Sequence, residues 1–310
     1  MVADTKRLAG HLAGAVVLFA VFLPVWSRFD TLLSAGQPSR PVPAAPPPQA
    51  ASATNASPRT ASYEIDVTLD PSARTLTGSE VITWRNLRAL PAYSIRLHLY
   101  WNAFRNTNST WLKQRQLAGD DALGAAAESD FGYTNVTSPT QIGADGSETP
   151  LPNFRHISPD DQNRDDRSLA AADLPAGVAP GETIRLRVQW TGRFPRNFDR
   201  TGAIGDYFFV SQWFPKLGVF GDGGCEARQF FANAEFFSDF ADYDVRMTVP
   251  AGWIVGATGV EQSRAPAGDR VTHRYTQQNV HDFAWTTSPD FVERAQRFEH
   301  PGLPPVALRA

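Results

Sequence analysis

The stretch "YEIDVTLDPSARTLTGSEVITWRN", residues 63–86, sets the pattern that most of the chain follows. Residues 63, 65, 67 and 69 are apolar, whereas residues 64, 66 and 68 are acidic or hydroxylated. This alternation is typical of a β-strand with one buried face. The turn-rich link "DPSARTLTG" (70–78) follows, and "SEVITWRN" (79–86) predicts the returning strand.

The same alternation recurs along the chain. "SIRLHLYW" (94–101) predicts a third strand that carries His98 on its polar face, and we expect the first three strands to form an antiparallel meander. "DDALGAAAES" (120–129) suggests only a short helix. Further strands are predicted in "ETIRLRVQW" (182–190), "YDVRMTVP" (243–250), "AGWIVGATG" (251–259), "RVTHRYT" (270–276) and "HDFAWTTS" (281–288). About eight strands without a long helical pattern predict an all-β, saddle- or sandwich-like domain that is mostly antiparallel.

Composition excludes several classes of protein. The 310 residues contain 29 Lys and Arg against 32 Asp and Glu, so no basic excess points to a nucleic-acid partner. Eight Trp and 20 Phe supply a packed interior. The single cysteine, Cys225, excludes an internal disulfide framework and a cysteine-based zinc knuckle. No neighbouring base accompanies this thiol, which favours an inert residue over a nucleophile.

The N-terminal residues do not fit the β pattern. Lys6 and Arg7 precede the apolar run "LAGAVVLFAVFLPVW" (12–26), which predicts a signal peptide or membrane anchor over residues 1–35. Residues 36–61 are rich in Pro, Ala and Ser and predict a disordered, semi-stiff linker. We therefore expect an exported protein, periplasmic or extracellular, or one anchored to the membrane by this segment.

Residues that could perform chemistry are few. No two of the six histidines are three to five residues apart, and no H-E-x-x-H motif occurs, so we assign no catalytic residue and no metal ligand. His273 is predicted to be a hydrogen-bonded core residue. The pair His281–Asp282 admits a catalytic interpretation, but without a nucleophile elbow a structural cap is favoured. The acidic run at 160–166 lacks the pattern of a calcium loop and favours a solvated loop.

Several stretches together resemble a known family. The first is "YEIDVTLDPSARTLTGSEVITWRNLRALPAYSIRLHLYWNAFRN" (63–106), and the later ones are "SQWFPKLGVF" (211–220), "AEFFSDFADYDVRMTVPAGWIVGATG" (234–259) and "HDFAWTTSPDF" (281–291). In order and spacing these resemble the N-terminal domain of the aminopeptidase N family of zinc metallopeptidases, as its bacterial exported members have it. The resemblance covers about residues 62–295.

The resemblance implies a β-rich domain, here residues 62–300, that packs against a separate catalytic domain. In the family that catalytic domain binds one zinc through H-E-x-x-H and a further glutamate and cleaves peptides. This sequence lacks the motif, and we expect "PGLPPVALRA" (301–310) to be the truncated start of a following segment. The resemblance therefore implies a chain without a cofactor of its own and inactive alone. Zinc and peptide hydrolysis would belong to a catalytic domain that is missing or supplied by a separate chain.

The resemblance also implies candidate substrate-binding residues. The family's N-terminal domain contributes a glutamine or glutamate that lines the pocket for the substrate's amino end, shortly upstream of an aromatic–proline segment like "WFP" (213–215). Gln212 is the nearest candidate and Glu235 a weaker one, while a glutamine simply hydrogen-bonded in a loop remains the alternative. We expect the aromatic residues of "AEFFSDFADY" to pack in the interior and at the seam with the catalytic domain.

A different class of function also fits the sequence. A stand-alone β-sandwich module outside the cytoplasm would bind peptides, proteins or carbohydrate without any catalytic partner. The gene fragment, the split enzyme and the stand-alone module all remain open at this point.

Overall fold

The computed structural model describes residues 60–303 except 222, together with residues 305–309. These residues belong to one compact unit. The signal or anchor segment predicted at 1–35 and nearly all of the linker predicted at 36–61 lie outside the described residues. Among the described residues, no helix combines the length and apolar character that crossing a bilayer requires.

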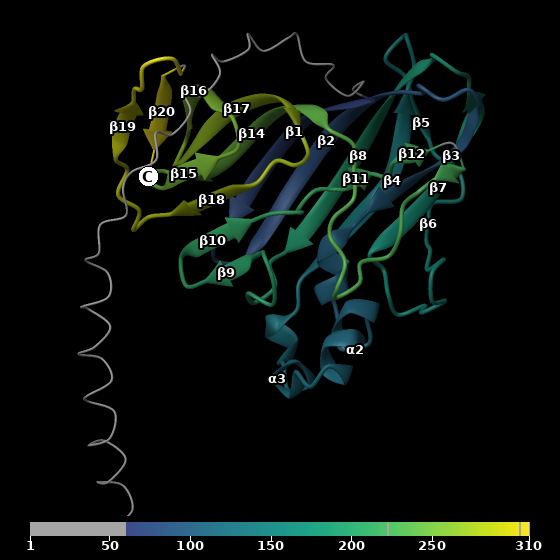
Figure 1. Cartoon of the computed structure of the whole chain (residues 1–310), viewed down its shortest axis with the longest axis horizontal. Coiled ribbons are helices and arrows are strands. Elements are labelled where there is room, and N and C mark those ends of the chain that lie inside the picture. The colour runs from purple at the N-terminus through teal and green to yellow at the C-terminus, as the bar shows by residue number, and fades with distance from the viewer. Residues whose placement is uncertain (1–59, 222, 304, 310) are drawn as a thin grey trace, which may run out of the picture. The chain divides into compact units, whose positions relative to one another are not determined.

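An eight-stranded sheet forms the framework of the described unit (Figure 1). Its central strand β1 pairs antiparallel with β2 on one side and parallel with β14 on the other. In spatial order the strands are β16 (Val260–Ala267), β17 (Arg270–Val280), β14 (Ala241–Pro250), β1 (Ala61–Asp70), β2 (Thr75–Arg85), β8 (Thr183–Arg193), β4 (Tyr133–Ile142) and β5 (Glu148–Pro150).

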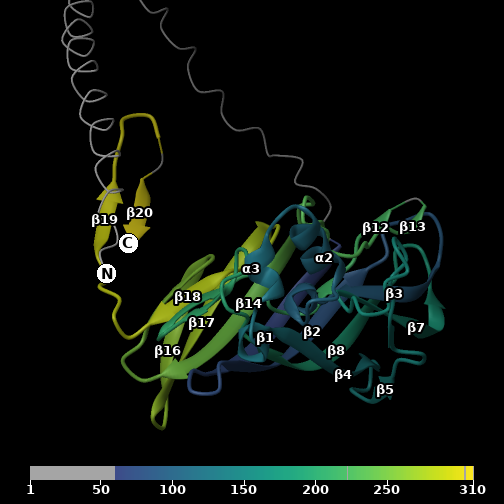
Figure 2. The same ribbon diagram turned by 90° about the horizontal axis from the view of Figure 1, so that it is seen from below.

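Two four-stranded sheets cover one face of this framework. Figure 1 and Figure 2 agree in placing the first near β14 and β17 and the second near β4 and β5. The first contains β15 (Ile254–Ala257), β18 (Trp285–Ser288), β10 (Tyr207–Val210) and β9 (Gly202–Ile204). The second contains β11 (Lys216–Leu217), β3 (Ala92–His98), β7 (Leu169–Val178) and β6 (Arg155–His156). Apolar residues from all three sheets share one core, which makes the fold sandwich-like.

Short elements complete the fold. Two separate ribbons pair β12 (Phe220–Gly221) with β13 (Gly224–Cys225) and β19 (Ala295–Phe298) with β20 (Val306–Arg309). The helical elements are η1 (Tyr100–Phe104), α2 (Thr110–Leu117), α3 (Asp121–Gly124) and η2 (Glu128–Asp130). Residues of η1 and α2, with Leu123 and Phe230, form a second, smaller apolar cluster.

The alternation of apolar and polar residues explains why one face of the large sheet is buried. The odd residues of β1 from Tyr63 to Leu69 are buried, while Glu64 and Asp66 on the opposite face are exposed. In register across the sheet, Gly78 of β2 lies opposite Trp190 of β8. A Cβ at Gly78 would lie 2.3 Å from the Trp190 ring, so only glycine fits beneath this indole. The prediction of a mostly antiparallel all-β fold is therefore confirmed.

Two local predictions were wrong, and a third holds only in part. β3 does not extend the meander, because β2 pairs instead with β8 and β3 joins the second small sheet. His98 is 2 % exposed and not on a solvated face, and the ring of Tyr100 stacks on it with the two ring centres 4.8 Å apart. The acidic run is a loop with Asp161 and Asp165 exposed, as predicted, but Asp166 is buried and accepts a hydrogen bond from the backbone nitrogen of Thr110 at 3.0 Å, which binds the loop to the start of α2.

One acidic residue lies on the buried face of the large sheet. Glu80 is 1 % exposed and lies in register between Ile65 and Val188. Neither of its carboxylate oxygens has a hydrogen-bond partner among the described residues. Burial raises the pKa of this carboxyl well above its ordinary value, because the charged form loses its hydration. Glu80 therefore stays protonated in the fold at a pH where it ionises in the unfolded chain.

Replacing Glu80 should change how stability depends on pH. Since the folded pKa is raised, this residue's contribution is fully present below the unfolded pKa of about 4.3 and is lost as pH rises toward the folded value. Glu80→Gln should therefore gain stability over the wild type by up to about 1.4 kcal/mol per pH unit through that range. Urea unfolding at pH 4, 6 and 8 measures the difference. Glu64→Gln, on the exposed face of β1, is the matched control, and parallel curves for wild type and Glu80→Gln would contradict the assignment.

Candidate functional site

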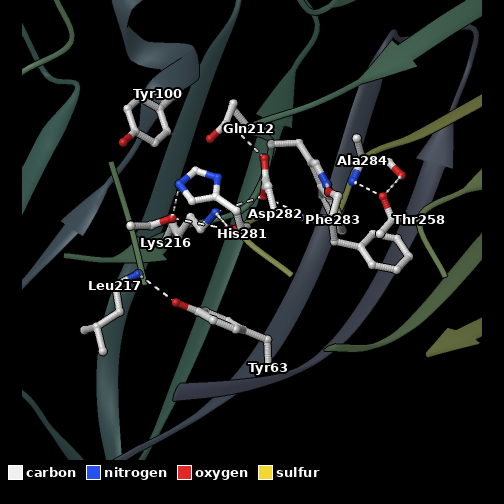
Figure 3. A network of polar contacts seen from close by, with 12 residues as sticks. Tyr63, Tyr100, Gln212, Lys216, Leu217, Thr258, His281, Asp282, Phe283 and Ala284 are labelled. Carbon is white, nitrogen blue, oxygen red and sulfur yellow. Dashed lines mark hydrogen bonds and ion pairs between the residues drawn. The ribbon is translucent and has the colours of Figure 1, made fainter. Parts of the chain in front are cut away.

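Two segments that lie far apart in the sequence meet beside the core. The indole Nε1 of Trp213 donates a hydrogen bond of 2.8 Å to the backbone oxygen of Phe283, 70 residues away. Trp213 is fully buried between Trp190 and Trp285. These contacts hold the segment 211–217 against the segment 281–284, and the polar residues of both face one another (Figure 3).

Asp282 is the centre of this polar network. Its Oδ1 accepts hydrogen bonds from Lys216 Nζ at 3.1 Å and from its neighbour's backbone nitrogen, that of Phe283, at 2.9 Å. Its Oδ2 accepts from the side-chain amide of Gln212. Lys216 also donates to the backbone oxygen of His281. The carboxylate thus receives donors on both oxygens, which is the condition for burying a charge at tolerable cost.

Lys216 is the most deeply buried charged member of the network. Its side chain is 2 % exposed, compared with 15 % for Asp282. Burial lowers the pKa of the ammonium group, and the neighbouring carboxylate opposes that change. The Nζ atom lies 5.8 Å from the centre of the Phe214 ring, which adds a cation–π contact. The positive charge of Lys216 therefore depends on the neighbouring carboxylate of Asp282.

Gln212, the first sequence-predicted site residue, lies in this network. Its backbone has a φ of +53°, in the left-handed region that side chains rarely adopt. The residue is 8 % exposed, and its Oε1 has no hydrogen-bond partner among the described residues. One end of the amide is fixed by Asp282 while the other end leaves an acceptor unused. A strained, partly satisfied residue of this kind is typical of a functional position.

Glu235, the second predicted residue, lies elsewhere. Its carboxylate forms a bidentate ion pair with Arg200 at 2.8 and 2.9 Å, and its side chain is 74 % exposed. It lines a pocket with His98 and Tyr100, to which Gln212 does not contribute. The structure therefore does not bring the two candidates into one pocket.

His281 and Ser238 form a pair, but not a catalytic triad with Asp282. The Nε2 atom of His281 lies 3.0 Å from Ser238 Oγ, which also donates to the His281 backbone oxygen at 3.3 Å. Burial, and then the charge of Lys216, lowers the pKa of this imidazole. The Asp282 oxygens are occupied by Lys216, Gln212 and a backbone N–H, so they do not orient the imidazole ring. This geometry supports the structural interpretation over the catalytic one.

The described residues do not suit a zinc ion. No three His, Cys, Asp or Glu side chains within the described ranges are grouped closely enough to hold one. His273 bonds through Nδ1 to Glu261 Oε1 at 2.8 Å and is 3 % exposed, as predicted for a core histidine.

The sequence alone did not identify Lys216 as a residue of this network. The lysine follows the "WFP" segment directly, but its partner Asp282 is 66 residues further on, so no local spacing connects the two. The one indication in the sequence was the position of this lysine directly after an aromatic–proline segment.

Comparison with known proteins gives fold-level similarity alone. No family model matches the chain, and no curated protein matches it. Among solved structures, an M1 zinc metallopeptidase from Deinococcus radiodurans is 18 % identical, with a TM-score of 0.47 over 81 % of this chain and 47 % of that one. A point mutant of that enzyme bound to a Tyr-Ser-Ala substrate is 16 % identical, with a TM-score of 0.47. The chain spans about half the length of these structures. Similarity of this extent does not assign a family.

Breaking the Lys216–Asp282 pair should destabilise the fold strongly. Lys216→Met leaves the carboxylate without its cation, and Asp282→Asn leaves the buried ammonium unpaired, so each should cost about 3–5 kcal/mol. The double variant should cost less than the sum of the two, because it leaves no unpaired charge. Chemical denaturation measures all three. Arg115→Met, which breaks an exposed pair with Asp120, is the control and should cost at most about 1 kcal/mol. Losses below 1 kcal/mol in both single variants would show that the pair is dispensable.

Proposed function

We propose that this chain forms the non-catalytic N-terminal β domain of an exported zinc metallopeptidase of the aminopeptidase type. One observation carries the proposal. Two stretches on which the sequence resemblance rests, "SQWFPK" and "HDFAW", form a single buried network through Trp213, Lys216 and Asp282. Residues that lie far apart in the sequence thus belong to one structural unit. This unit explains why they occur together as a set.

In this proposal the domain helps to form the pocket for the amino end of a peptide. A protonated amine needs hydrogen-bond acceptors, and the Oε1 of Gln212, which is buried and has no partner among the described residues, is a neutral one. Glu235 is the weaker candidate, since Arg200 already neutralises its carboxylate. Zinc and hydrolysis belong to a catalytic domain that continues the polypeptide or comes from another chain. The N-terminal segment would direct the protein out of the cytoplasm or anchor it to the membrane.

The proposal predicts no peptidase activity for these 310 residues. The purified chain should not hydrolyse an aminoacyl-naphthylamide, with or without added zinc, because it contains no H-E-x-x-H motif. Sequencing the DNA beyond codon 310, or in neighbouring genes, should show a frame that encodes this motif. Hydrolysis that chelators abolish would contradict the proposal. A purified chain that binds peptides or sugars with no such frame nearby would favour a stand-alone module.

Once a catalytic partner is identified, Gln212 can be tested directly. Gln212→Ala should raise the KM for a substrate with a free amino terminus by about tenfold, since a hydrogen bond to a charged group is lost. It should leave kcat for the same substrate unchanged, because a binding contact made equally in the ground state and the transition state is lost. Glu64→Gln, an exposed substitution on the outer face of β1, is the control. A fall in kcat at unchanged KM, together with a lower thermal stability of the variant, would show that Gln212 acts through the fold and not through the amine.

The segment 236–240 provides a test of the interface. Phe237 and Phe240 are 51 % and 46 % exposed, whereas Tyr243 is buried in the core. We expect residues 61–310 alone to be poorly soluble and to bind a hydrophobic-surface dye, because this apolar surface lacks its partner. The double variant Phe237→Ser and Phe240→Ser should bind less dye at unchanged thermal stability. A soluble monomer that binds no dye would argue against a missing catalytic domain.

A further inference from the structure

Three nitrogen-bearing side chains from separate parts of the chain lie near one another, away from the Asp282 network. Arg105 caps the C-terminus of η1, His156 ends β6, and Arg167 precedes β7. His156 is in register with Ala170 of β7, shortly after Arg167. The pairing of β6 with β7 therefore brings the imidazole and the second arginine to the same part of the surface.

One buried amide fixes the two arginines. Asn102 is fully buried, and its Oδ1 accepts a hydrogen bond from Arg105 Nη1 at 3.1 Å while its Nδ2 donates to the backbone oxygen of Arg167 at 2.9 Å. Arg105 Nη1 also donates to Asn135 Oδ1 at 2.9 Å, and the guanidinium carbon lies 5.0 Å from the centre of the Tyr133 ring. These contacts fix the plane of the guanidinium but leave its Nε and Nη2 groups without a hydrogen-bond partner among the described residues. Arginine uses such an edge to bind oxyanions.

No carboxylate balances the charge of the two arginines. Asp173 pairs with a different arginine at 3.8 Å, and the oxygens of buried Asp166 accept hydrogen bonds from other partners. Asp165, in the same loop as Arg167, is exposed and pairs with neither guanidinium. Within the described part of the chain, Arg105 and Arg167 form no ion pair, so the cluster keeps a net positive charge.

The three groups act on one another electrostatically. Loss of hydration, followed by the charge of Arg167, lowers the pKa of Arg105. Loss of hydration, followed by the charges of Arg167 and Arg105, lowers the pKa of His156 to about 4. His156 is therefore neutral at pH 7 and offers one donor and one acceptor nitrogen. Like charges held together in this way favour an anion between them.

We infer that Arg105, Arg167 and His156 bind a tetrahedral oxyanion, a phosphate or sulfate group. Arg105 offers one edge of its guanidinium, and the exposed side chains of Arg167 and His156 supply further nitrogens. A carboxylate has two oxygens, which one arginine satisfies, whereas a phosphate or sulfate group presents three or more. The inference does not rest on the proposed function, because it uses no residue of the Asp282 network and no catalytic domain.

Titration of the full chain with phosphate, sulfate and acetate at low ionic strength tests the inference by NMR. Phosphate or sulfate should bind saturably and at least about tenfold more tightly than acetate, because one further charge-assisted hydrogen bond contributes about that factor. The bound anion should raise the pKa of His156, since a neighbouring negative charge favours the imidazolium. Tighter binding of phosphate indicates a phosphate group, tighter binding of sulfate indicates a sulfate group, and equal binding shows that the site accepts both. Acetate that binds as tightly as either anion, an unchanged His156 pKa at saturation, or no saturable binding overturns the inference.

Variants separate a defined site from general attraction to positive charge. Arg167→Gln should weaken the binding of phosphate or sulfate by about tenfold, since a charged donor is lost, and should leave thermal stability unchanged because the side chain is exposed. Arg164→Gln removes the same charge from the same loop and is the matched control, which should retain binding. Arg105→Lys keeps the charge but loses the planar fork, so it should also weaken binding. Equal losses in Arg164→Gln and Arg167→Gln would refute the inference.

Discussion

The packing of two small sheets on one apolar face of the eight-stranded sheet is the contact on which the structure depends. Side chains of β1, β2, β8 and β14 contribute every second residue to a common core with residues of both small sheets. Because strand side chains alternate, a shift of one residue in any of these strands would turn its apolar side chains outward. The register therefore fixes what the outer face presents as well as what the core contains.

The polar network around Asp282 is a consequence of this packing. Trp213 and Phe283 belong to the core, and their positions bring Gln212, Lys216 and Asp282 together at its edge. The network is thus built on rigid surroundings, although its residues lie outside long strands. Gln212 has a strained backbone and an unused acceptor in this setting, which is why it is a stronger candidate than the exposed, ion-paired Glu235.

The alternation of apolar and polar residues predicted most of the strands, and it failed for physical reasons where it did fail. It placed the strands around Tyr63 and Tyr243 correctly because each buries one face and exposes the other. The alternation failed at His98, because a strand with polar residues on one face gives the same sequence pattern whether that face is exposed or covered. It gave the wrong neighbour for β3, since pairing depends on contacts between distant residues. The alternation could not predict the Lys216–Asp282 pair either, because these two residues also lie far apart in the sequence.

The parallel pairing of β1 with β14 has a further effect during synthesis. The exposed ion pair between Asp66 and Arg246 joins residues 180 positions apart, and the central strand of the sheet remains without one neighbour until β14 has been made. Long-range strand pairing of this kind slows folding and leaves an open strand edge available to other chains in the meantime. A polypeptide that ends before β14 would therefore leave this edge of β1 unpaired and the large sheet without three of its strands.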